Sequence, residues 1–150
     1  YPGGSKEIFN TLPDSTETKL VIKSRFGFLK LAMKFGAPLV PAFVFGEKWR
    51  YKRYAFSESM VKWALNTLKF PLILFWGRYG SLLPFTHYNG KELPGMGVVY
   101  GKPIELPHTD TPTQEQLDDA MKVYCEAVEG LYNEYKAEFG YGEEETLVLS

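Results

Sequence analysis

The sequence predicts an α/β fold in which a mainly parallel sheet is flanked by helices. Short runs rich in β-branched and apolar residues, at 18–23 and 38–45, enclose an amphipathic stretch at 25–35. This strand–helix–strand order is typical of parallel pairing, because the helix carries the chain back to start the next strand in the same direction. A long periodic segment at 112–139 predicts a helix that packs across one side of the sheet.

The first helix has recognisable boundaries, and the alternation of helix and strand continues after it. Ser24 is a suitable N-cap for the helix at 25–35, and Gly36 stands where a helix stop is expected. Residues 57–69 predict a second helix, and residues 72–76 predict a second buried strand.

The second half of the chain begins with an irregular stretch. Residues 79–97 are rich in glycine and proline and predict a loop, and residues 96–106 predict an extended strand. Thr111 and Gln114 have capping-box spacing, with proline between them at the first helical position, so the last helix is expected to begin there. Its buried stripe consists of Leu117, Met121, Tyr124, Val128, Leu131 and Tyr135, and Gly140 is the expected stop.

Composition excludes several classes of function. The 17 basic and 18 acidic residues give a net charge of −1, so no global field attracts nucleic acid, and no nucleic-acid partner is expected. Cys125 is the only cysteine, which excludes an internal disulfide and a cysteine-rich zinc site, and no metal is expected; its place in a helix predicts a packing role. The apolar runs are shorter than the roughly 20 residues that a membrane-spanning helix needs.

Two histidines are available for general-base chemistry. His87 is followed by Glu92 five positions later, which superficially matches an H-x-x-x-x-D signature, but it lies in the glycine- and proline-rich loop. His108 lies just before the last helix and is expected to be a solvated turn residue. The sequence has no G-x-S-x-G, P-loop, G-x-G-x-x-G or H-E-x-x-H motif, so hydrolase, nucleotide-binding and zinc-protease functions have no support.

Two short segments suit ligand contact. Residues 48–54 interleave four cations with three aromatic side chains, which predicts either an exposed surface for phosphate groups or lipid headgroups, or a solvated turn after a strand. Near the amino terminus, Gly3 and Gly4 allow a ligand to approach the backbone, and Glu7 follows at a distance from which it can orient a hydroxyl. The alternative for this second segment is a tight turn before a helix.

These segments belong to a longer series of motifs that resembles the type-2 diacylglycerol acyltransferase family, with its monoacylglycerol and wax-ester relatives. The order and the intervals of the motifs match as well, over nearly all of the chain. The matching blocks are P-G-G-S-K-E at 2–7, S-R-F-G-F-L-K-L-A at 24–32, G-A-P-L-V-P-A-F-V-F-G-E at 36–47, F-W-G-R-Y-G at 75–80 and G-K-P-I at 101–104.

The resemblance implies a glycerolipid-acyltransferase fold and a membrane-bound enzyme of the endoplasmic reticulum, facing the cytosol, and of the lipid droplet. Its partners would be acyl-CoA, a co-substrate rather than a cofactor, and diacylglycerol, whose acylation gives triacylglycerol. Residues 1–150 would be the carboxy-terminal part of one acyltransferase domain. The catalytic H-P-H-G block and the membrane segments are expected upstream of Tyr1, so membrane association would come through that missing part, and this fragment alone is expected to be inactive.

Among the residues of this chain, the resemblance implies substrate-binding roles for Gly3, Gly4, Glu7 and Arg25. The basic and aromatic run at 48–54 would then lie near the entrance for acyl-CoA or the lipid headgroup. The alternatives are a lysophospholipid or monoacylglycerol acyltransferase of the same fold, and a non-catalytic module that binds lipid or docks on a membrane.

Overall fold

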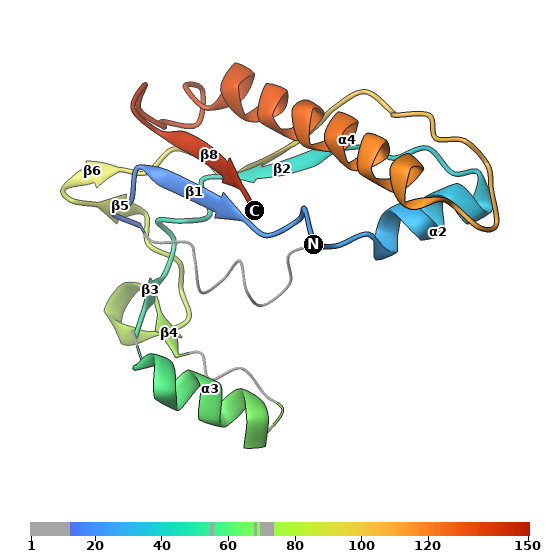
Figure 1. Cartoon of the computed structure of the whole chain (residues 1–150). Coiled ribbons are helices and arrows are strands. Elements are labelled where there is room, and N and C mark those ends of the chain that lie inside the picture. Colours follow the sequence, from blue (N-terminus) through green and yellow to red (C-terminus); the bar gives the residue numbers. More distant parts are fainter. Residues whose placement is uncertain (1–12, 55, 68, 70–73) are drawn as a thin grey trace.

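The residues that the structure describes form a mixed α/β fold with three α-helices and several short strands. The computed structural model describes residues 13–54, 56–67, 69 and 74–150, and among these no helix is both long enough and apolar enough to cross a bilayer (Figure 1). The elements in chain order are β1 (Glu17–Leu20), α2 (Gly27–Phe35), β2 (Ala42–Phe45), β3 (Lys52–Arg53), α3 (Glu58–Thr67), β4 (Phe75–Trp76), the 3-10 turn η1 (Arg78–Gly80), β5 (His87–Tyr88), β6 (Lys91–Glu92), β7 (Gly97–Tyr100), α4 (Gln114–Tyr135) and β8 (Thr146–Leu149).

The described strands form four two-stranded sheets. β1 pairs with β8 in parallel, with Glu17 opposite Thr146, whereas β2 pairs with β7 antiparallel, with Ala42 opposite Tyr100. The β3–β4 and β5–β6 pairs are also antiparallel. The expected mainly parallel sheet is therefore not confirmed, although the α/β class is.

The connections between the strands explain the antiparallel pairs. The helix α2 follows β1, but it leads to β2, whose hydrogen-bonded neighbour is β7 rather than β1. Between β5 and β6, Asn89 and Gly90 both have positive φ, at 50° and 76°, which is the conformation of a tight hairpin turn. Such a turn reverses the chain and permits only antiparallel pairing.

The long helix α4 organises the core, as Figure 1 shows by its position above β2 and β8 and beside α2. Its amino-terminal half packs with α2 around Leu29, Met33 and Leu117. Its carboxy-terminal half packs with β2 in an aromatic cluster, in which Phe45 stacks on Phe139 with ring centroids 4.7 Å apart. The helix predicted at 112–139 is confirmed, but it ends at Tyr135 and not at the expected stop, Gly140. Four residues of its predicted stripe are buried, whereas Tyr124 and Tyr135 are half-buried.

The helix ends follow the predicted chemistry with two corrections. Gly36 ends α2 with φ at 59°, as expected of a left-handed stop. The N-cap of α4 is Thr113, whose hydroxyl accepts from the Gln116 N–H while the Gln116 side chain bonds back to the Thr113 N–H, so the expected start at Thr111 is wrong by two residues. The N-cap of α2 is Phe26 with no side-chain bond, so Ser24 is not its cap.

A smaller lobe, made of β3, α3, β4 and η1, lies at the end of the molecule away from α4 (Figure 1). The Tyr54 N–H donates to the Leu74 carbonyl at 2.9 Å, and the Arg78 N–H donates to the Leu83 carbonyl at 2.7 Å. The helix predicted at 57–69 is confirmed as α3. The strand predicted at 72–76 is β4, but it is not buried as predicted, since Leu74 and Phe75 are exposed; residues 72–73 lie outside the described residues.

Candidate functional site

Of the four predicted substrate-binding residues, the structure describes Arg25. The other three, Gly3, Gly4 and Glu7, lie outside the described residues. Arg25 lies in the turn between β1 and α2, where its backbone N–H donates to the Ile22 carbonyl at 2.8 Å and its side chain is exposed. The turn fixes the backbone of Arg25 and leaves the guanidinium accessible to a ligand.

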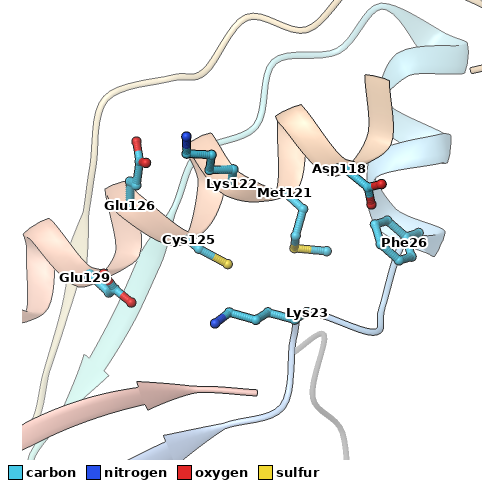
Figure 2. Close-up of a pocket in the computed structure, with 8 residues that line it drawn as sticks. All are labelled: Lys23, Phe26, Asp118, Met121, Lys122, Cys125, Glu126 and Glu129. Carbon is cyan, nitrogen blue, oxygen red and sulfur yellow. The ribbon is translucent and has the colours of Figure 1, made fainter. Parts of the chain in front are cut away.

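The same turn forms one wall of an open pocket of about 360 Å³. Figure 2 shows Lys23 and Phe26 on this wall, facing residues of α4, with the Lys23 side chain extended beneath Cys125 towards Glu129. The apolar part of the lining is Phe26, Met121 and Cys125, and the charged part is Lys23, Asp118, Lys122, Glu126 and Glu129. This mixture suits a ligand with an apolar body and a polar end.

Nothing in the pocket is poised for catalysis. Burial raises the pKa of the Cys125 thiol, with a smaller opposing effect from Lys23, so the thiol stays protonated at neutral pH and is a weak nucleophile. Cys125 packs in the core between α2 and α4, which confirms its predicted packing role. Within the described ranges, no three histidine, cysteine or acidic side chains are grouped to hold a metal ion.

A buried ion pair lies at the other end of α4. Lys48 bonds the carboxylate of Glu145, and the two side chains are only 3% and 12% exposed. The Lys48 ammonium also donates to the Ser15 carbonyl at 3.2 Å and lies 4.8 Å and 4.9 Å from the ring centroids of Trp49 and Tyr141. A cation held between two rings and a carboxylate has no face left for a soluble ligand.

Tyr141 completes this cluster from the segment after α4. Its hydroxyl accepts the backbone N–H of Gly46 at 3.1 Å, and burial raises the pKa of its phenol to about 12. Gly46 has φ at 77°, so the backbone turns sharply where β2 ends and directs Lys48 inward. No sequence pattern predicts this cluster, because Glu145 lies in a run of three glutamates that is typical of a solvated segment.

The exposed surface predicted for residues 48–54 is therefore wrong for its first three residues. Lys48 and Trp49 are buried. Arg50 is partly buried, and its guanidinium donates to the Phe85 carbonyl at 3.0 Å and to the Pro94 carbonyl. Lys52 and Tyr54 are exposed as predicted, and Tyr51 is half-buried. The physical reason is that these cations have buried partners distant in the sequence, which outweigh solvation.

Comparison with known proteins identifies the family. The profile of the diacylglycerol acyltransferase family matches residues 1–150, which is the whole chain. The chain belongs to the diacylglycerol acyltransferase family. This confirms the family resemblance drawn from the sequence motifs. No solved structure matches the chain.

Three relatives illustrate the range of the family. The chain is 35% identical to 2-acylglycerol O-acyltransferase 1 of Mus musculus, over 98% of this chain and 44% of the relative. It is 32% identical to diacylglycerol O-acyltransferase 2 of Danio rerio, over 98% of this chain and 41% of the relative. It is 30% identical to acyl-CoA wax alcohol acyltransferase 2 of Homo sapiens, over 98% of this chain and 44% of the relative. The chain therefore spans less than half the length of the curated relatives that it matches.

The family motifs now have positions in the fold. The R-x-G-F block is the turn at Arg25 and the first residues of α2, beside the pocket. The block that ends in F-G-E is β2 and the bend at Gly46, which leads directly into the buried Lys48–Glu145 pair. Both blocks thus form junctions where a strand or helix meets α4 or the segment that follows it.

Both histidines of this family member are exposed and bond neighbouring residues. His87 is exposed, bonds Thr86 through Nδ1 at 3.1 Å, and lies opposite Glu92 in the β5–β6 hairpin, so its match to an acyltransferase signature is a cross-strand pair. His108 is exposed, as expected of a turn residue, and its Nε2 lies 3.1 Å from the carbonyl of Lys34 near the end of α2.

Proposed function

We propose that this chain is the carboxy-terminal part of an O-acyltransferase that transfers an acyl group from acyl-CoA to the hydroxyl of diacylglycerol and so forms triacylglycerol. The observation that carries the proposal is the family match over the whole chain. The printed names of the relatives support it, since each is an acyltransferase and two of the three illustrated name a glycerolipid acceptor.

The chemistry divides between this chain and the rest of the protein. The acceptor hydroxyl attacks the thioester carbonyl, a general base takes its proton, and the CoA thiolate leaves. Because His87 and His108 are both exposed, and the family resemblance implies a catalytic histidine block outside this chain, we place the base upstream of Tyr1. The chain's part is to hold substrate, with acyl-CoA as co-substrate and no cofactor, at the cytosolic face of the endoplasmic reticulum or on the lipid droplet.

We assign substrate contact to Gly3, Gly4 and Glu7 and to Arg25. The exposed guanidinium of Arg25 can bond phosphate oxygens in pairs, and acyl-CoA supplies phosphates. Arg25→Lys keeps the charge and Arg25→Gln removes it, so a phosphate contact predicts a KM for acyl-CoA that rises from wild type to Lys to Gln. An equal KM in all three proteins would exclude Arg25 from the site.

The test of the function is acyl transfer from labelled oleoyl-CoA in microsomes with diacylglycerol as acceptor. The complete polypeptide that contains this chain should form triacylglycerol, and the 150-residue chain alone should form none. Transfer by the chain alone, or no transfer to any acceptor by the complete polypeptide, would contradict the proposal.

Monoacylglycerol is the second candidate acceptor, because the chain is 35% identical to a 2-acylglycerol O-acyltransferase and 32% identical to a diacylglycerol O-acyltransferase. The same assay with 2-acylglycerol, diacylglycerol and a long-chain alcohol in parallel separates the acceptors. A preference for 2-acylglycerol would correct the substrate and leave the reaction unchanged.

A further inference from the structure

The small lobe differs in charge from the rest of the molecule. Residues 51–85 contain five of the 17 basic residues and one of the 18 acidic residues, so this segment carries +4 while the rest of the chain carries −5. The composition of the whole chain, at −1, conceals this separation. A basic segment of this kind is attracted to an anionic surface at close range.

The same lobe exposes large apolar side chains. Trp63 is 59% exposed and shares one face of α3 with Met60, three residues earlier, while Ala64 is buried. Leu74, Leu82 and Leu83 are exposed as well, and Leu82 reaches 71%. Several large apolar side chains exposed in one segment, together with cations, suit a surface that has a partner.

Hydrogen bonds join the strands and the loop of this lobe to one another. The Tyr54 N–H bonds the Leu74 carbonyl, the Tyr51 hydroxyl bonds the Leu82 carbonyl at 3.1 Å, and the Arg78 N–H bonds the Leu83 carbonyl. Figure 1 shows the lobe projecting from the body that α4 organises. The backbone carbonyls of Leu74, Leu82 and Leu83 are therefore held in place while their apolar side chains are exposed.

Tyr79 marks the tip of the loop after β4. Its ring is 88% exposed, and its backbone has φ at 57°, in the left-handed region that is unfavourable for a residue with a side chain. The Arg78 guanidinium lies 5.3 Å from the Tyr79 ring centroid. An exposed aromatic ring beside a cation is the side-chain pair that favours the boundary between lipid headgroups and acyl chains.

From the charge and the exposed side chains together we propose that the small lobe docks on a bilayer surface that carries anionic lipid, through the described residues among 51–85. Apolar side chains such as Trp63 and Leu82 enter the headgroup layer, and cations such as Lys52 and Lys69 lie at the lipid phosphates. This contact does not depend on the proposed acyl transfer, because it needs neither acyl-CoA nor a catalytic base.

The test is flotation of the 150-residue chain with vesicles of phosphatidylcholine alone, or with about one third phosphatidylserine, and without acyl-CoA. Binding should require phosphatidylserine and weaken when salt is raised from about 0.1 M to about 0.5 M. Trp63→Ser and Leu82→Ser should each lower the partition coefficient about tenfold or more. Lys52→Gln should lower it about fivefold.

Matched controls come from α2, which has exposed side chains of the same types. Leu31→Ser and Lys30→Gln alter an exposed apolar residue and an exposed cation outside the lobe and should leave vesicle binding unchanged. Equal loss in these controls, absence of binding, or binding that is indifferent to phosphatidylserine would overturn the proposal. So would self-association without vesicles that Trp63→Ser abolishes, since the lobe would then be a dimer interface.

Discussion

The Lys48–Glu145 pair makes a quantitative prediction about stability. Lys48→Met keeps the length of the side chain and its contact with the rings, but it removes the charge and leaves the Glu145 carboxylate without its partner. Breaking a buried ion pair from one side costs about 3–5 kcal/mol, because the remaining charge is still out of water. The lost interactions of the ammonium with Trp49 and Tyr141 add to this cost.

A loss of this size is large for a domain. A typical domain has a free energy of unfolding of about 5–15 kcal/mol, so Lys48→Met would leave the chain marginally folded at room temperature. The double variant Lys48→Met/Glu145→Met replaces both charges by apolar groups of similar volume and should recover most of the loss. The measurement is urea unfolding followed by circular dichroism, with the midpoint and slope compared among the variants.

An exposed ion pair in the same chain supplies the control. Lys19 and Glu17 lie 3.0 Å apart with side chains 46% and 49% exposed, and such pairs contribute at most about 1 kcal/mol. Lys19→Met should therefore barely move the unfolding midpoint. The reasoning fails if Lys48→Met costs no more than Lys19→Met, or if the double variant costs the sum of its two single changes.

Three further changes have matched controls. Thr113→Ala removes the hydroxyl that caps α4 and should cost about 0.5–2 kcal/mol, whereas Thr111→Ala should cost almost nothing. Gly36→Ala places a side chain at φ 59° and should cost about 1–2 kcal/mol, whereas Gly130→Ala, inside α4 with open space around it, should stabilise by about 0.5–1 kcal/mol. Burial raises the pKa of Tyr141 from 10 to about 12, so this residue contributes its full stabilisation below pH 10 and loses it as the pH rises towards 12. Between these pH values the free energy of unfolding should fall by about 1.4 kcal/mol per pH unit because of Tyr141, and Tyr141→Phe should remove this part of the fall. Urea unfolding at pH 7 and from pH 9 to 11 measures these effects, and a reversed order within a pair or an unchanged alkaline slope would contradict them.

The helices could be predicted because their signals are local. The stripe of α4 repeats within one helix, and Gly36 marks the end of α2 through its own backbone preference. The error at Thr111 is also local, because Thr111 and Thr113 each have a glutamine three positions later, and sequence spacing alone does not decide between them.

Strand pairing and the Lys48 cluster could not be predicted in the same way. Lys48 and Glu145 are 97 positions apart, and nothing in either neighbourhood specifies the other. The alternation of strand and helix predicts a parallel sheet, yet it does not say which strand will be the neighbour. One local signal does specify a pairing, because Asn89-Gly90 is a strong hairpin turn and predicts the antiparallel β5–β6 pair.

The basic run has a role that follows from where it lies in the chain. Residues 46–96 form one excursion between the paired strands β2 and β7, and the run stands at the point where the chain leaves β2. Arg50 spans the base of the excursion by bonding the Phe85 and Pro94 carbonyls, and Lys48 ties the same point to the segment after α4. Two anchored cations at the base hold the excursion against the body while its tip remains exposed. Cations that the sequence suggested would touch lipid thus hold the lobe in place, and the proposed lipid contact belongs to residues farther along the same excursion.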